Sequence, residues 1–140
     1  MHRLKVIAAS GRLWAENYAV DEVCRGNLDI DTFDLTGMCA IASAKLFNDL
    51  QMAGFSVKIA SNWSHCFVVV DDEYIVDVTA TQFGKYQKVC IKEVRHTKGV
   101  HYWKQTLVHE SSADLRHYQR DAGWISGQVV PPELAEQACR

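Results

Sequence analysis

Residues 65–78, HCFVVVDDEYIVDV, decide the fold of this chain. Two runs rich in valine, isoleucine and aromatic residues flank an acidic tripeptide, and this pattern predicts a β-hairpin whose first strand begins at His65. Because side chains alternate across a strand, a three-residue turn that pairs Val70 with Tyr74 would place His65 and Asp77 on one face. A two-residue turn would place Asp77 on the opposite face.

Asp77 is an unusual residue for the middle of an apolar strand, between two valines. Aspartate is depleted in strands, and a buried carboxylate costs several kcal/mol unless it has a partner. His65 is the nearest candidate partner within the hairpin. We therefore expect the two side chains to meet.

A helix is expected before the hairpin, over residues 36–54, TGMCAIASAKLFNDLQMAG. The Thr36 hydroxyl can cap the first turn, and Gly54 suits the left-handed position that ends a helix. Cys39 would then be the third helical residue. One apolar stripe would comprise Cys39, Ala42, Leu46, Leu50 and Ala53.

The remaining elements indicate an α+β fold. Before the central helix, the sequence predicts a helix over 4–23, which Gly11 weakens or splits, and a loop over 28–35. A strand over 55–60 precedes the hairpin. After the hairpin we expect a strand over 88–94, a strand or irregular segment over 101–108, and helices over 111–121 and 133–139. The strands follow one another and do not alternate with helices. We therefore expect an antiparallel sheet packed on the helix that carries Cys39.

The composition is that of one globular domain over residues 1–140, with 48% hydrophobic residues and a net charge of −2. The small negative charge gives no electrostatic case for nucleic acid as a partner. No apolar run is long enough to span a membrane, and the apolar stretch 6–9 is too short for a signal peptide. The expected compartment is the cytoplasm.

The cysteines favour neither a disulfide framework nor a zinc site. Their number is odd, and no two are spaced as CxxC. We expect free thiols, no metal and no other cofactor. The five are Cys24, Cys39, Cys66, Cys90 and Cys139.

Cys39, His65 and Asp77 together have the side chains that a cysteine nucleophile requires. A helix N-terminus and a nearby imidazole would favour the Cys39 thiolate, lowering the pKa of the thiol. The imidazole of His65 would accept the thiol proton, and the Asp77 carboxylate would fix its tautomer. The backbone N–H of Cys39 could donate to an oxyanion. Each residue alone also fits a purely structural role.

Two segments, GMCAIASAKLFNDLQMAGFSVKI (37–59) and HCFVVVDDEYIVDVTATQFG (65–84), resemble the core of the transglutaminase-like and papain-like cysteine enzymes. The resemblance covers residues 35–84, which would be the catalytic core. It implies a papain-like or transglutaminase-like fold, with Cys39 as nucleophile, His65 as base and Asp77 as the orienting residue.

One feature of papain-type enzymes is absent, because no glutamine lies just upstream of Cys39 to donate to an oxyanion. Asn27 and Gln82 are the candidates for a second donor. Trp63 would flank the site, either by excluding water from it or by ordinary packing. The segments 24–34 and 85–103 are the candidate specificity loops.

The resemblance implies a thiol hydrolase that cleaves or deamidates an amide bond through a thioester, as a cysteine peptidase or a protein deamidase. An acyltransferase or transglutaminase with the same triad is an alternative, and a catalytically inactive binding module is another. A peptide or protein substrate is the expected partner. The sequence leaves the oligomeric state open.

Overall fold

The computed structural model describes residues 1–26, 35, 37–62 and 65–111. This part of the chain has an α+β architecture, as the sequence predicts. Its helices and strands are α1 (His2–Cys24), α2 (Cys39–Met52), β1 (Val57–Ser61), β2 (Cys66–Val70), β3 (Tyr74–Asp77), β4 (Cys90–Glu93) and β5 (Leu107–His109). Short 3-10 helices lie at η1 (Ala80–Phe83), η2 (Val94–His96) and η3 (His101–Trp103).

The strands form one antiparallel sheet in the order β4-β3-β2-β1-β5. Val70 pairs with Tyr74, which confirms the three-residue turn and its odd-to-odd pairing. Asp71 and Asp72 adopt positive φ angles of 56° and 55°, a conformation that aspartate tolerates better than most residues. The β2–β3 hairpin therefore has the register that the triad hypothesis requires.

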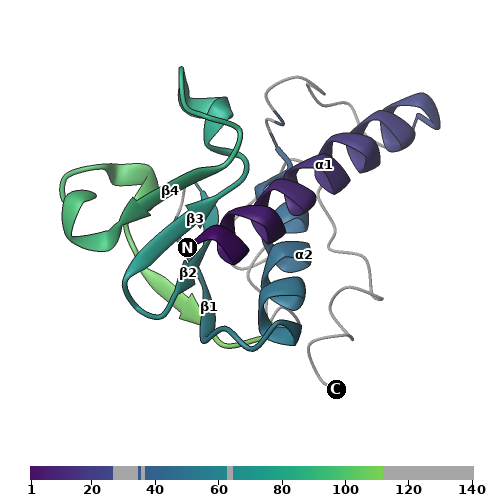
Figure 1. Cartoon of the computed structure of the whole chain (residues 1–140). Coiled ribbons are helices and arrows are strands. Elements are labelled where there is room, and N and C mark those ends of the chain that lie inside the picture. The colour runs from purple at the N-terminus through teal and green to yellow at the C-terminus, as the bar shows by residue number, and fades with distance from the viewer. Residues whose placement is uncertain (27–34, 36, 63–64, 112–140) are drawn as a thin grey trace.

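Helix α2 is the centre of the fold, between α1 on one side and strands β1 and β2 on the other (Figure 1). Both of its sides are consequently covered, and most of its side chains are buried. The predicted stripe lies within this buried surface as far as Leu50, whereas Ala53 is half-buried.

The observed ends of α2 agree with the predicted helix at its C-terminus but not at its N-terminus. Gly54 has a φ of +93° and follows the C-cap residue Ala53, as expected of a left-handed helix end. At the other end Met38 is the N-cap, so Cys39 is the first helical residue and not the third. Thr36 lies outside the described residues, as do the predicted helices at 111–121 and 133–139 and the loop up to residue 34.

Helix α1 runs unbroken through Gly11, so the expected split does not occur. A β-carbon at Gly11 would lie 3.5 Å from Leu46 of α2, which is an ordinary packing distance. The glycine costs roughly 1 kcal/mol of helix propensity. Packing of α1 on α2 offsets this cost, as is usual for helices in a folded protein.

The sheet face opposite α2 is covered by the segment that follows β4, which Figure 1 shows on the side of the sheet away from both helices. Phe67, Val69 and Ile75 of the sheet pack there with Trp103 of this segment in one apolar cluster. In the described ranges, no helix is both long and apolar enough to cross a membrane.

Candidate functional site

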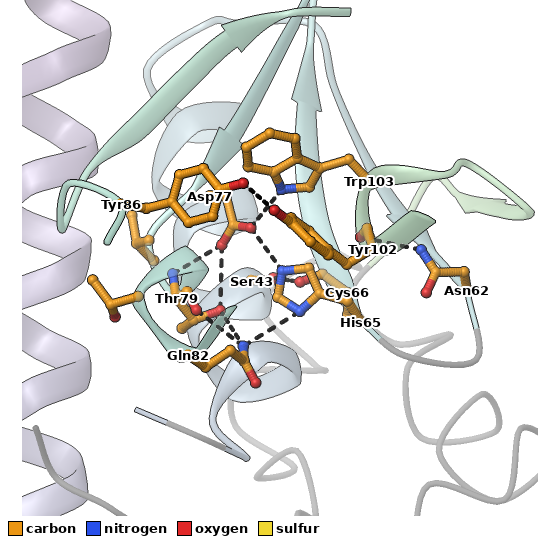
Figure 2. A network of polar contacts seen from close by, with 12 residues as sticks. Ser43, Asn62, His65, Cys66, Asp77, Thr79, Gln82, Tyr86, Tyr102 and Trp103 are labelled. Atoms are coloured by element: carbon orange, nitrogen blue, oxygen red, sulfur yellow. Dashed lines mark hydrogen bonds and ion pairs between the residues drawn. The ribbon is translucent and has the colours of Figure 1, made fainter. Parts of the chain in front are cut away.

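His65 and Asp77 form a buried pair at one end of the β2–β3 hairpin. The Nε2 atom of His65 lies 2.7 Å from Oδ2 of Asp77, and the two residues are 0% and 2% exposed (Figure 2). His65 directly precedes β2 and does not belong to it. Because a carboxylate can only accept, Nε2 carries the proton and Nδ1 is the basic nitrogen of the neutral ring.

Three more hydrogen bonds fix the Asp77 carboxylate. The indole N–H of Trp103 donates to Oδ2 at 2.8 Å, and the backbone N–H and hydroxyl of Thr79 donate to Oδ1 at 2.9 and 3.3 Å. Burial by itself raises the pKa of Asp77, but His65 and these donors outweigh it and hold the pKa below its usual value. Asp77 is therefore a carboxylate at neutral pH.

Aromatic rings and an amide surround the imidazole of His65. Phe67 stacks on it with ring centroids 5.9 Å apart, and Phe83 contacts it edge-on at 4.7 Å. Gln82, one of the two candidate oxyanion donors, places its Nε2 atom 3.4 Å from His65 Nδ1 and donates to the Thr79 carbonyl at 3.0 Å. Its amide thus lies beside the basic nitrogen.

The Cys39 sulfur contacts the backbone of Cys66, the residue that follows His65. The backbone N–H groups of Cys66 and Ala40 both donate to it. Because Cys66 follows His65, the sulfur lies beside the peptide that joins them. Helix α2, which carries Cys39, packs on one face of the sheet, whereas Asp77 belongs to the other face, the face of Ile75. No hydrogen bond joins Cys39 to the imidazole among the residues that the structure describes.

Burial dominates the electrostatics of the Cys39 thiol, which is only 3% exposed. Burial raises its pKa well above the usual value, and the nearby Cys66 and Asp77 add to the effect. The two N–H donors lower the pKa but do not offset the burial. The expectation of a lowered pKa is therefore wrong, and a base must remove the thiol proton for the sulfur to react.

This electrostatic result predicts how Cys39 reacts with a small alkylating agent. At neutral pH we expect iodoacetamide to modify Cys39 more slowly than the exposed Cys24, and the Cys39 rate to keep rising at alkaline pH. Peptide-resolved mass spectrometry of samples quenched over time measures both rates in one protein. Preferential labelling of Cys39 at neutral pH would contradict the expected effect of burial.

Ser43 is a polar residue of this site that the sequence does not single out. Its hydroxyl, one turn after Cys39, donates to the Cys66 carbonyl at 3.2 Å. Helix α2 thus contacts the backbone of Cys66 at two points: the Ser43 hydroxyl donates to the Cys66 carbonyl, and the Cys39 sulfur accepts the Cys66 N–H. A serine among buried alanines at this spacing is the only sequence signal for the contact.

Arg12 of α1 is a second such residue, and it is 3% exposed. Its guanidinium donates to the Val78 carbonyl and to the Thr81 hydroxyl, both at 2.9 Å, and its Nε donates to Glu16 at 2.8 Å. Val78 and Thr81 flank the Thr79 that holds Asp77. Helix α1 therefore anchors the segment that holds the Asp77 carboxylate. The sequence signal is an arginine four residues after Ala8 and three before Ala15, two alanines that are fully buried.

The other candidate site residues, Asn27 and Trp63, lie outside the described residues. Cys24, Cys39, Cys66 and Cys90 are free thiols, and burial raises the pKa of Cys66 to about 12 and that of Cys90 to about 11. No cluster of three His, Cys, Asp or Glu side chains suited to a metal ion occurs within residues 1–26, 35, 37–62 and 65–111.

Comparisons with known proteins leave the site to be interpreted from its own geometry. Neither a protein-family model, nor a curated protein, nor a solved structure matches the chain.

Proposed function

We propose that the chain is a thiol-dependent acyl-transfer enzyme that attacks amide bonds, with Cys39 as nucleophile, His65 as base and Asp77 as orienting carboxylate. The observation that carries the proposal is the buried His65–Asp77 hydrogen bond of 2.7 Å, together with the Cys39 sulfur that accepts the backbone N–H of Cys66, the residue after His65. The bond leaves Nδ1 as the only basic nitrogen of His65. Two backbone N–H groups at the sulfur would stabilise a thiolate as it forms.

The chemistry follows from these positions. Nδ1 of His65 takes the proton from the Cys39 thiol as the sulfur attacks the amide carbonyl, and the backbone N–H of Cys39 donates to the oxyanion. The C–N bond then breaks, the imidazolium gives its proton to the departing amine, and a thioester remains. Water releases the acid and restores the thiol. Catalytic hydrogen bonds are often long in unliganded enzymes, which is consistent with the separation of Cys39 from the ring.

The architecture supports placing the chain with the transglutaminase-like or papain-like enzymes. A helix begins at Cys39, packs on an antiparallel sheet, and precedes the hairpin that carries His65 and Asp77. The order cysteine, histidine, aspartate is the one that the resemblance implies. We propose residues 35–84 as the catalytic core and a peptide or protein as substrate.

A catalytically inactive binding module of the same fold is the second candidate, and one observation favours it. The His65 ring is 0% exposed, and Cys39 is 3% exposed. In such a module the network around Asp77 would serve only to hold the hairpin, η1 and η3 together.

Turnover of simple acyl donors tests the proposal. The enzyme should release aminocoumarin from acetyl-peptide amides or ammonia from glutamine-containing peptides. A hydrolase should give the free acid with or without an added primary amine, whereas an acyltransferase should form the amine adduct efficiently. Absence of turnover and of any acylated protein across both substrate sets would favour the binding module.

A further inference from the structure

A cavity of about 600 Å³ opens in the segment after β4, within the candidate specificity loop 85–103 and just beyond it. Val94, Val100 and the buried Trp103 give it an apolar lining. Thr97 also lines it, but its hydroxyl is engaged because it donates to the Val94 carbonyl at 2.7 Å. The lining thus brings apolar residues together with polar and charged ones.

The charged residues around this cavity are all basic. Arg95, Lys98 and Lys104 line it together with His101, and no lining residue is acidic. Arg95 donates to Glu93 at 2.8 Å, whereas neither Lys98 nor Lys104 forms an ion pair with any residue that the structure describes. The whole chain carries a net charge of −2, so this concentration of positive charge is local. An anionic group next to an apolar one would complement the cavity.

Trp103 connects the cavity to the catalytic pair. Trp103 lines the cavity, and its indole N–H donates to Oδ2 of Asp77 at 2.8 Å, while the same oxygen accepts from His65 at 2.7 Å (Figure 2). A ligand in the cavity would therefore contact a residue whose indole is hydrogen-bonded to the Asp77 carboxylate. No other lining residue makes such a contact with Asp77 among the described residues.

We propose that this basic cavity binds an acidic side chain with an apolar neighbour, in a peptide segment of the substrate. That this peptide segment is part of a substrate rests on the proposed function, whereas the binding of an acidic peptide in the cavity does not depend on it. The apolar residues of the lining and the confinement of charge to one cavity favour a peptide over nucleic acid, which requires a basic surface that follows the phosphate backbone.

The test is a titration of the Cys39→Ala variant, which cannot turn over, with acetyl-Glu-Leu-Glu-amide. We expect a saturable shift of the Trp103 indole N–H resonance, which a Trp103→Phe spectrum assigns. The uncharged acetyl-Gln-Leu-Gln-amide should bind at least about tenfold more weakly. Raising the ionic strength should weaken binding of the acidic peptide only.

A pair of charge reversals localises the effect. Lys98→Glu with Lys104→Glu should weaken binding of the acidic peptide by about tenfold or more, because both lysines line the cavity. The matched pair Lys5→Glu with Arg3→Glu changes the same net charge at exposed positions of α1, outside both candidate specificity loops and the lining, and should change binding by less than about twofold. All four side chains are exposed, and the dispersion of the spectra verifies the fold of each variant.

Several results would overturn the inference: an unmoved Trp103 signal, equal binding of the glutamine peptide, equal losses in the two double variants, or tighter binding of oligodeoxythymidine than of the acidic peptide. Acylation of Cys39 without peptide binding in the cavity would refute this inference and leave the proposed function intact. Peptide binding without any acylation would refute the proposed function alone.

Discussion

Replacing Cys39 with alanine is expected to lower kcat/KM for any amide or ester substrate by about 10⁴-fold or more, because no other group can form the thioester. The free energy of unfolding should change by only about 1 kcal/mol, since one small buried group is removed. Initial rates on the best acyl donor and urea unfolding of the same preparations measure both quantities.

Cys66→Ala is the matched control for Cys39→Ala. It removes a buried sulfur next to the same site, yet Cys66 belongs to the α2 face of the sheet and contributes its backbone N–H, which alanine retains. We expect it to keep most of the activity.

His65→Ala should lose as much activity as Cys39→Ala. The double variant Cys39→Ala with His65→Ala should lose no more activity than either single variant, because the effects of residues that act as a unit are not additive. A fully active Cys39→Ala protein would refute the assigned nucleophile.

Asp77→Ala is expected to have the largest effect on stability, about 3–5 kcal/mol of unfolding free energy, because it leaves several buried hydrogen-bond donors without their acceptor. The hydrogen bonds from His65, Trp103 and Thr79 would all lose their acceptor. Activity should fall as well, since the imidazole would no longer be held in the tautomer with a basic Nδ1. Chemical denaturation and initial rates measure the two effects.

Asp21→Ala is the control for this substitution, because Asp21 is an exposed aspartate of α1. It should change the unfolding free energy by no more than about 0.5 kcal/mol. If Asp77→Ala were equally mild, the carboxylate would not be the centre of the buried network.

The pH dependence of stability gives a second test of Asp77. Its pKa in the folded protein is lowered from 3.8, so the carboxylate stabilises the fold at pH values above about 4 and this contribution is lost as the pH falls through the folded pKa. Asp77→Asn cannot titrate. Its unfolding free energy should therefore be lower at neutral pH and fall less steeply on acidification than that of the parent protein, as urea unfolding across the acid range would show.

The sequence predicts the part of this site that depends on local rules. Alternation along the strands and an odd-length turn are enough to bring Asp77 to His65, and the cost of burying a carboxylate identifies the pair. Gly54 marks the end of α2 for an equally local reason, its positive φ.

Features that depend on distant segments were not predicted. Trp103 donates to Asp77 from 26 positions later in the chain, in a segment whose structure the sequence left open between strand and irregular. The buried Arg12 joins α1 to a carbonyl 66 positions away. The position of Arg12 along α1 indicates that it is buried, but neither for Arg12 nor for Trp103 does the sequence spacing identify the distant partner.

The pKa of Cys39 shows where a local rule fails. The position of this residue at a helix N-terminus favours a thiolate, and two backbone N–H groups do surround the sulfur. The sequence does not show that α1, α2 and the sheet together exclude water from it. Desolvation of the charged form then outweighs the dipole, which reverses the direction of the shift.

The most direct test of the central claim is to identify which side chain carries the acyl group during turnover. The protein is mixed with the best acyl donor, quenched in acid within one turnover and digested, and the modified peptide is sequenced by mass spectrometry. We predict a hydroxylamine-sensitive thioester on Cys39 alone, absent from His65→Ala. An acyl group on another residue, or one on Cys39 that forms equally fast in His65→Ala, would contradict the account.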